Sequence, residues 1–531
     1  MEKTISLNEA DNNNIILGTP ITGILILRGS RTYGKKNGKL LYKCVPNNKE
    51  YPSFLVPYEI KNIGFSKLYT DQYVTFSYLD WNSKHPHGVL KMVIGDVDKL
   101  ENFFEYQLHC YNLKIPYSIF QKDITKILEN TTENDIINII KTKYPSIEDR
   151  TLWHTFTIDP EDSKDFDDGF SIIDLDENTQ QISIYISNVT LWIDALNIWD
   201  SFSQRVSTIY LPNKKIPMLP QILSDYICSL QQKTIRVAFT MDIIVKNDDI
   251  IDIKFANCFI NVFKNYVYEE RDLLNNDKYM QLLKLSKKLS TKFEYTIIND
   301  SHDLVQYLMI LMNHKCALEL VNKKCGIFRG AIKKDEEILV TEVIPEDIKK
   351  SIKMWGNASG QYIDFTKISD DVKKIKHDML NLEAYIHITS PIRRLVDLLN
   401  IIKFQEITGL VKFSKNVDIF YTKWLDNLEY INKTVKSIRK VQNNCNLLYL
   451  CLNNLGILDL EYDGYIFDKI MKNNEKDNII RYKYVVYLPE LKLYSTITIL
   501  ENLNNFTHKK FKFFAFLDEH NVKQKIRLHM I

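Results

Sequence analysis

The sequence predicts an α+β fold in which a large mixed domain lies between two small β-barrels. Short β-rich segments separated by turns near both ends of the chain are typical of small barrels. They are expected at 22–27, 41–45, 73–78 and 88–93, and again at 463–467, 482–488 and 511–516. Between them, 303–323 carries apolar residues at helical spacing and predicts a mostly buried helix.

Changes in pattern divide the chain into five expected segments. They are a polar tail at 1–16, an OB-like barrel at 17–98, a helical connector at 99–148, a large mixed domain at 149–452 and a second OB-like barrel at 453–531. Pro116 and Pro145 break the connector. A chain of 531 residues has room for such a division.

A basic turn follows the first predicted strand. It carries Arg28, Arg31, Lys35, Lys36 and Lys39, with Tyr33 among them. Basic residues with an interleaved aromatic suit single-stranded nucleic acid on an OB-type barrel. A solvated basic hairpin tip explains this feature equally well.

Net charge, cysteine spacing and apolar runs limit the kinds of protein that this sequence can encode. A net charge of +2 does not exclude a nucleic-acid partner, because an acidic site can offset a basic channel. No two of the eight cysteines are spaced as Cys-x-x-Cys, which argues against a zinc site or a redox motif. There is neither a signal peptide nor an apolar run of the ~18 residues that a membrane span needs. We therefore expect an intracellular, cytoplasmic protein.

The densest charge in the sequence lies between Asp159 and Asp168, where six carboxylates surround a single lysine. Like charges repel, and burying them without a partner costs several kcal/mol or forces protonation. A divalent cation resolves this conflict, since carboxylate oxygens are the preferred ligands of Mg²⁺, Mn²⁺ and Ca²⁺.

A solvated acidic turn is the alternative for this loop. However, 154–158 and 170–175 read as strands, which puts the acids on a tight connection between two strands. The spacing does not match an EF-hand calcium loop. The pattern Asp-x5-Asp-x-Asp-Asp suits a one- or two-metal phosphoryl-transfer site.

A second chemically distinctive segment begins at Ser390. The apolar spacing after Pro391 predicts a helix with Ser390 as its N-cap, and helix N-termini attract phosphate. Arg393 adds a planar guanidinium that can hold a phosphate with two hydrogen bonds. Consecutive helical side chains diverge by about 100°, so we expect one of Arg393 and Arg394 to face a ligand and the other to form a structural ion pair. A solvent-facing basic turn is the alternative.

Together these segments resemble the signatures of the ribonuclease II/ribonuclease R family, whose catalytic unit is the RNB domain. Two further blocks in family order strengthen the resemblance: 210–230, with Tyr210-Leu211-Pro212, and 377–385, which precedes the arginines. The resemblance covers nearly the whole chain. It implies an RNB-type domain at 149–452, a cold-shock-like barrel before it and an S1-like barrel after it.

The resemblance also implies a function. The family hydrolyses single-stranded RNA from its 3′ end, releases nucleoside 5′-monophosphates and uses Mg²⁺, with Mn²⁺ as an alternative. By position, Asp159, Asp165, Asp167 and Asp168 match the metal-binding acids, Asp168 and Arg393 the catalytic residues, and Tyr210, Tyr268, Ser390 and Arg393 the RNA contacts. Without the resemblance, buried tyrosines would be read as core.

Some positions depart from the family pattern. Gln306-Tyr307 replaces an acidic pair, 293–298 is short where relatives place a further stacking aromatic, and acids are absent at 441–444. We therefore expect base clamping, processivity and product length to differ from the family pattern. We therefore keep two hypotheses, an active Mg²⁺-dependent 3′→5′ exoribonuclease and an inactive RNA-binding protein on the same scaffold; a metal-dependent DNA nuclease is a third reading. We expect a monomer without a membrane partner, and membership of a larger RNA-degradation complex stays open.

Overall fold

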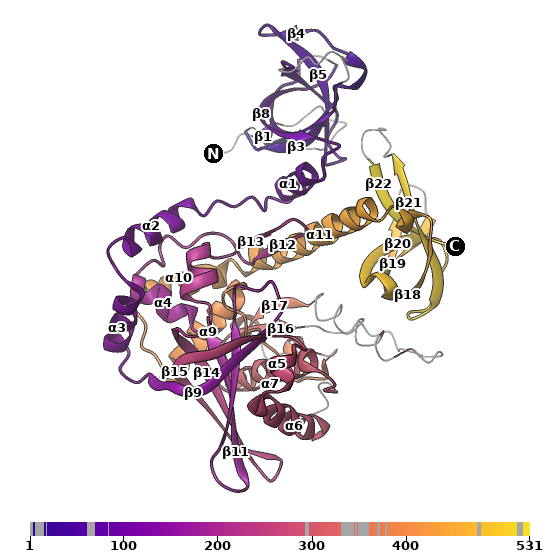
Figure 1. The fold of residues 1–531 in the computed structure, drawn as a ribbon. Helices are drawn as coiled ribbons and strands as arrows, with labels where there is room; N and C mark the ends of the chain where they lie inside the picture. Colours follow the sequence, from indigo (N-terminus) through magenta and orange to yellow (C-terminus); the bar gives the residue numbers. More distant parts are fainter. Residues whose placement is uncertain are drawn as a thin grey trace.

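The computed structural model has an α+β fold in which helices connect sheets of five and six strands (Figure 1). It describes residues 4–5, 15–16, 18–60, 69–82, 84–292, 297–330, 345, 348, 360–368, 372–377, 380–474, 479–517 and 524–531. The predicted fold class is confirmed. Most of the short segment 293–298, at which the family pattern changes, lies outside the described residues.

The N-terminal sheet closes into a small barrel. Its strands are β3 (Ile21–Leu25), β4 (Lys35–Lys36), β5 (Lys39–Pro46), β6 (Phe54–Tyr58), β7 (Gln72–Asp80) and β8 (His87–Asp96). The ring closes because β3 pairs with both β5 and β7, while β6 pairs in parallel with β8. This is the Greek-key barrel of the OB type. Gly88 allows the close approach, since a Cβ there would lie 2.7 Å from the Phe76 ring.

The four strands predicted in this region are confirmed, and β6, which contains Pro57, was missed. Within the predicted polar tail, β1 (Thr4–Ile5) and β2 (Ile15–Ile16) form a short antiparallel pair.

Helices connect this barrel to the rest of the chain. They are α1 (Leu100–Cys110), α2 (Ser118–Leu128) and α3 (Glu133–Lys143). A capping box between Thr132 and Asp135 fixes the start of α3. α1 contacts the long helix α11 (Leu428–Asn453), and Asn444 donates a hydrogen bond to Gln107 across this contact at 3.2 Å.

A second closed barrel forms the centre of the large domain. Its strands are β9 (Glu148–Asp159), β10 (Asp168–Asp174), β11 (Thr179–Ser187), β14 (Ile235–Lys246) and β15 (Asp249–Val267). A parallel pairing of β15 with β9 closes it. Helix α7 (Ser301–Asn322), predicted at 303–323, shares a buried core with the barrel, in which Leu304 and Leu308 join Phe156 and Phe170. Helices on the outside explain why β14 is buried along nearly its whole length.

The remaining helices and strands of the large domain lie beside this barrel or, like β12, beside the long helix α11 (Figure 1). They are α4 (Val189–Leu196), β12 (Ile209–Leu211), β13 (Lys214–Ile216), α5 (Arg271–Leu274), α6 (Asp277–Lys292), β16 (Ile327–Gly330), β17 (Gln361–Asp364), α9 (Leu395–Ile407) and α10 (Lys415–Asp426). The buried indoles of Trp192 and Trp424 lie in the core that joins α4, α9 and α10.

The C-terminal sheet has the strand order β20-β19-β18-β21-β22. Its strands are β18 (Glu461–Asn474), β19 (Ile479–Leu488), β20 (Leu493–Ile499), β21 (His508–Leu517) and β22 (Gln524–Met530). Its first strand, β18, pairs with both β19 and β21, as β3 pairs with both β5 and β7, and β20 and β22 contact each other. Three strands predicted here are confirmed; β20 and β22 were missed.

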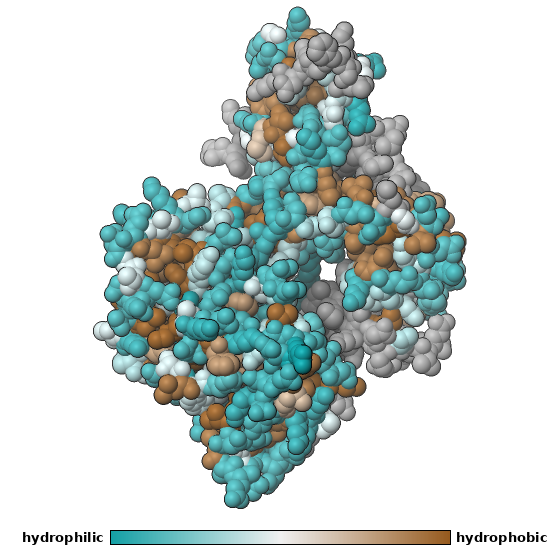
Figure 2. Space-filling model, in the orientation of Figure 1, coloured by the Kyte–Doolittle hydropathy of each residue, from teal (hydrophilic) through white to brown (hydrophobic). Residues whose placement is uncertain are grey.

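The surface is mostly hydrophilic on the face shown in Figure 2, with scattered apolar patches. Within the described part of the chain, no helix is both long and apolar enough to cross a membrane.

Candidate active site

The acidic loop lies at one end of the central barrel. Asp159 is the last residue of β9 and Asp168 the first of β10, and the two strands are neighbours. Asp167 and Asp168 are only 2% and 7% exposed. Glu161 and Asp162 are exposed. The loop therefore turns part of its charge inward, unlike a solvated acidic turn.

Hydrogen bonds to the loop backbone hold the loop in this position. The Ser229 hydroxyl accepts from the Phe166 N–H at 3.0 Å and donates to the Lys164 carbonyl at 2.8 Å. The Asp167 carbonyl accepts from the Ser187 N–H at 2.8 Å, at the end of β11. These contacts fix the backbone on both sides of Asp165 and so orient the acids that follow it.

Burial makes the charged forms of these acids unfavourable. It raises the pKa of Asp167 to about 8, although Arg393 and the Ile392 N–H lower it. Burial likewise raises the pKa of Asp168 to about 6, against the lowering effect of Arg393. The pKa of Asp159 is raised well above its usual value by burial and then by the neighbouring Asp168. A cation among these groups would favour their ionised forms.

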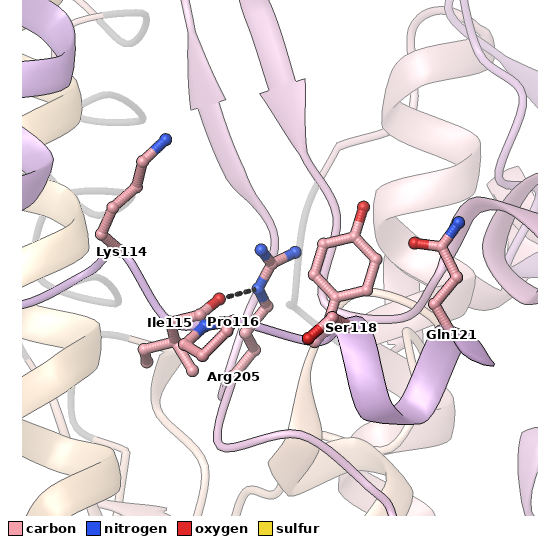
Figure 3. Close-up of a pocket in the computed structure, with 7 residues that line it drawn as sticks. Lys114, Ile115, Pro116, Ser118, Gln121 and Arg205 are labelled. Atoms are coloured by element: carbon pink, nitrogen blue, oxygen red, sulfur yellow. Dashed lines mark hydrogen bonds between the residues drawn. The ribbon is translucent and has the colours of Figure 1, made fainter. Parts of the chain in front are cut away.

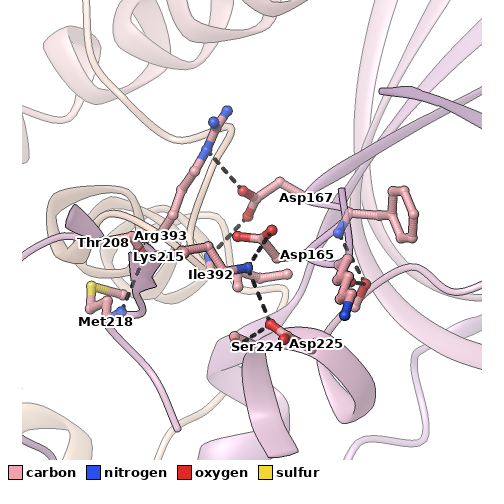
Figure 4. Close-up of polar contacts among 12 residues, drawn as sticks. Asp165, Asp167, Thr208, Lys215, Met218, Ser224, Asp225, Ile392 and Arg393 are labelled. Carbon is pink, nitrogen blue, oxygen red and sulfur yellow. Dashed lines mark hydrogen bonds and ion pairs between the residues drawn. The ribbon is translucent and has the colours of Figure 1, made fainter. Parts of the chain in front are cut away.

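The arginine segment reaches this loop from far along the chain. The Ile392 N–H donates to Asp167 Oδ1 at 2.9 Å, a contact between residues 225 apart in sequence. Arg393 Nε lies 3.2 Å from Asp167 Oδ2 (Figure 4). Asn313 of α7 supports the segment by accepting from the Ile388 N–H at 2.9 Å. The predicted acids and the predicted arginine therefore belong to one site.

The helix predicted to start at Ser390 begins later, so that prediction was wrong. The first residue of α9 is Leu395, and 391–393 form a turn. Arg394 is extended, with φ −136 and ψ 123, because it forms an antiparallel bridge with Ser207. A tertiary contact thus overrides the local helical pattern. Ser390 does not cap an α-helix; its N–H donates to Asp397 at 2.8 Å.

The two arginines have different surroundings. Arg394 donates to Asp397 at 2.7 Å, and that carboxylate is fully buried, which confirms a structural ion pair for one arginine. The Arg393 side chain is 46% exposed while it contacts Asp167. Ser390 is buried, and its hydroxyl accepts from Arg393 Nη2 at 3.2 Å. Ser390 therefore orients Arg393.

Both predicted RNA-contacting tyrosines lie at the acids. Burial and the nearby Asp165 and Asp167 raise the pKa of Tyr210, which is still 41% exposed. The Tyr268 N–H donates to the Asp159 carbonyl at 3.1 Å. The Tyr268 ring stacks on His302 with centroids 3.7 Å apart. Stacking of either tyrosine on a base stays a prediction.

The sequence reasoning missed one residue of this site, Lys215 on β13. Its Nζ lies 2.8 Å from Asp165 Oδ1 and 3.3 Å from Asp225 Oδ1 (Figure 4). Lys215 pairs in register with Tyr210 across the β12–β13 hairpin. The sequence signal that could have pointed to Lys215 is a lysine in a short strand next to Pro217. Nothing in the local sequence, however, indicates which acid that lysine contacts.

The donor set fits a divalent metal ion, although the acids are not gathered around one point. Among the described residues, no three His, Cys, Asp or Glu side chains lie together closely enough to hold a metal. Yet Asp159 Oδ2 and Asp168 Oδ2 are buried without a hydrogen-bond partner in the described chain. Orphaned carboxylate oxygens are unusual unless an ion satisfies them, and oxygen donors are what Mg²⁺ prefers.

A cavity of about 350 Å³ is lined by the connector residues 114–118 and 121 and by Arg205, and none of the predicted metal ligands lines it (Figure 3). Arg205 stacks on Tyr117 at 3.9 Å and donates to the Ile115 carbonyl at 3.0 Å. It also donates to the Pro217 carbonyl at 2.7 Å. Arg205 therefore fastens the connector to the segment that carries Lys215.

Comparison with known proteins assigns the family. The model of the RNB domain matches residues 147–296 and 280–410, which include the acidic loop and the arginine segment. This chain belongs to the RNB-domain family. The predicted resemblance is confirmed.

Individual RNB proteins are similar over different lengths. Ribonuclease R of Buchnera aphidicola is 26% identical over 352 residues, which cover 52% of this chain and 47% of that protein. The human exosome complex exonuclease RRP44 is 28% identical over 198 residues, which cover 36% of this chain and 20% of that protein. The chain thus matches about half or less of the length of these relatives.

Solved RNB structures share the whole fold. The apo form of Mycoplasma genitalium RNase R covers 100% of this chain, with 94% of its own chain matched, at a TM-score of 0.68 and 15% identity. That protein has also been solved with ribose-methylated single-stranded RNA and with double-stranded RNA. Yeast Ssd1, a pseudonuclease, covers 90% of this chain, with 65% of its own chain matched, at a TM-score of 0.61 and 13% identity.

Proposed function

We propose that this chain is a Mg²⁺-dependent exoribonuclease that shortens single-stranded RNA from its 3′ end and releases nucleoside 5′-monophosphates. The observation that carries the proposal is the contact of Arg393 with the acidic loop, at 3.2 Å from Asp167. A phosphate-binding cation beside buried, unsatisfied carboxylates is the arrangement that phosphoryl chemistry requires.

Each residue of the site has a chemical task in this proposal. Asp159 and Asp168 offer unsatisfied oxygens to a metal, and Asp165 and Asp167 complete the set. Bound Mg²⁺ would activate a water molecule and stabilise negative charge on the leaving oxygen. Arg393 is half-exposed, so its guanidinium would hold the scissile phosphate from beside Asp167, while Ser390 keeps it in place.

The rest of the chain would bring RNA to these acids. Tyr210 and Tyr268 would position the 3′-terminal nucleotides by stacking. The barrels of β3–β8 and β18–β22 would guide the strand, and the basic turn at 28–39 fits a backbone contact. The complex of Mycoplasma genitalium RNase R with single-stranded RNA supports RNA as the ligand of this fold.

A non-catalytic RNA-binding protein is the second candidate. It is favoured by the absence, in the described residues, of three metal-ligating side chains already gathered together. Ssd1, a pseudonuclease, has a similar fold. The presence of all four predicted acids favours the enzyme, because Asp159 and Asp168 each keep a buried oxygen that no hydrogen bond in the described chain satisfies.

The deciding experiment uses 5′-labelled single-stranded RNA and DNA of the same sequence. We expect stepwise shortening of the RNA from its 3′ end in Mg²⁺ and none in chelator. Tight RNA binding without shortening supports the second candidate. Equal shortening of the DNA supports a DNA nuclease, since the 2′-hydroxyl and the thymine methyl are what separate the two substrates.

Mg²⁺ should stabilise the protein more at high pH than at low pH. The folded-state pKa values of about 6 and about 8 at Asp168 and Asp167 exceed the ordinary value of 3.8. Between about pH 4 and 8 the folded chain holds protons that the unfolded chain has lost, so metal-free stability falls as pH rises. Mg²⁺ favours the ionised acids and counters that fall.

Thermal unfolding in chelator and in Mg²⁺ measures this effect. The melting temperature should rise with Mg²⁺ by about 2–5 °C at pH 8 and by under about 1 °C at pH 5. NaCl at matched ionic strength controls for screening. A Mg²⁺ effect of the same size at both pH values contradicts the assignment of these acids as ligands.

A further inference from the structure

Lys215 places a protein cation inside the acidic site. Its side chain is 25% exposed, and the carboxylates that it contacts, Asp165 and Asp225, are 11% and 7% exposed. Lys215 lies between them in Figure 4, with an interaction drawn to each. Asp165 is thus occupied by an ammonium group.

The contact divides the predicted metal ligands into two pairs. Asp165 is neutralised by Lys215, and Asp167 by Arg393 and the Ile392 N–H. Asp159 and Asp168 each keep a buried Oδ2 without a hydrogen-bond partner in the described chain and have no protein cation beside it; Asp167 Oδ2 also lacks a hydrogen bond but has its ion pair with Arg393. Lys215 contacts Oδ1 of Asp165, so Asp165 can offer both of its oxygens to a metal only after that ion pair breaks.

The structure also offers Lys215 a second position. Asp225 already lies 3.3 Å from its Nζ, and the Ser224 hydroxyl donates to the same Asp225 oxygen at 2.7 Å. A lysine that leaves Asp165 therefore keeps a carboxylate partner. This lowers the cost of the move, because an unpaired cation in a partly buried site is unfavourable.

We propose that Lys215 is a displaceable counterion, which holds Asp165 in the metal-free site and moves onto Asp225 when a divalent cation binds. The proposal rests on the metal site of the proposed function. It makes Lys215 a positioning residue that sets metal affinity without contacting RNA. Its position opposite Tyr210 on the β12–β13 hairpin links the move to a predicted RNA contact.

Calorimetric titration of Mg²⁺ into the RNA-free protein tests the proposal. Lys215→Met should tighten Mg²⁺ binding by about three- to tenfold, because it frees Asp165 and removes a repelling charge. Lys215→Arg should remain close to the original protein. The matched control is Lys214→Met on the same strand, since Lys214 pairs with Glu105 instead. The Mg²⁺ affinity of this variant should differ from that of the original protein by less than about twofold.

A second variant should change Mg²⁺ affinity in the opposite direction. Asp225→Asn removes the alternative partner of Lys215, so Mg²⁺ binding should weaken about threefold. In the Lys215→Met background, Asp225→Asn should change Mg²⁺ affinity by less than about twofold, because there is no lysine left for Asp225 to pair with. Circular dichroism verifies that each variant is folded.

The outcomes separate the two proposals. Weaker or unchanged Mg²⁺ binding in a folded Lys215→Met protein, or equal effects of Asp225→Asn in both backgrounds, overturns the counterion role while leaving the metal site intact. Failure of the unsubstituted protein to bind Mg²⁺ at millimolar concentration overturns both the metal site and the counterion.

Discussion

Asp168→Asn is expected to lower RNA cleavage by about 10³-fold or more, which corresponds to about 4 kcal/mol in the activation barrier. RNA affinity should stay within about threefold of the original. The asparagine keeps the shape of the side chain, and the backbone of Asp168 remains paired with Ile186 at the start of β10. What is lost is the negative charge that the proposed metal site requires of this residue.

The stability of the same variant gives an independent check. Burial opposes the charge of Asp168 and raises its pKa to about 6, so a neutral amide should leave the melting temperature in chelator unchanged or higher. Asp162→Asn is the matched control, because Asp162 belongs to the same loop but is exposed. Its cleavage rate should match the original. Equal loss of binding and cleavage in Asp168→Asn would instead assign the loop a structural role.

Substitutions of the two adjacent arginines are expected to affect different properties, catalysis for one and stability for the other. Arg393→Met removes the half-exposed cation beside Asp167, so kcat/KM should fall by about 10²-fold or more while the fold is kept. Arg394→Met strips a fully buried Asp397 of its ion-pair partner, so the free energy of unfolding should fall by about 3 kcal/mol.

Denaturant unfolding and steady-state kinetics on both variants distinguish these roles. The kinetics are compared well below the melting temperature, where Arg394→Met should keep most of its activity. A large catalytic loss in Arg394→Met together with a large stability loss in Arg393→Met would reverse the assignment of the two side chains.

The parts of the fold and site that local sequence could predict are those whose cause is local. Six acids and one lysine between Asp159 and Asp168 are an unusual concentration of charge that can be seen without knowing the fold. The segments on both sides of these acids have compositions typical of strands. The apolar spacing of 303–323 likewise predicts α7 to within two residues at its start.

The parts that failed depend on distant contacts. The apolar pattern after Ser390 is helical, but the bridge between Arg394 and Ser207 keeps the chain extended until Leu395. Lys215 contacts an acid 50 residues away, and no local pattern specifies that pairing. The strands β6, β20 and β22 were also missed; β6 lies between β8 and β5, and β20 and β22 are the outer strands of the C-terminal sheet.

The central claim is that the acidic loop and Arg393 form one hydrolytic site for RNA 3′ ends. Its most direct measurement is the product pattern from a 5′-labelled RNA duplex with a single-stranded 3′ tail, with the released nucleotides identified by chromatography. We predict a ladder that shortens from the 3′ tail only in Mg²⁺, together with nucleoside 5′-monophosphates. Bound RNA that stays full-length, or fragments that arise from internal cuts, would contradict it.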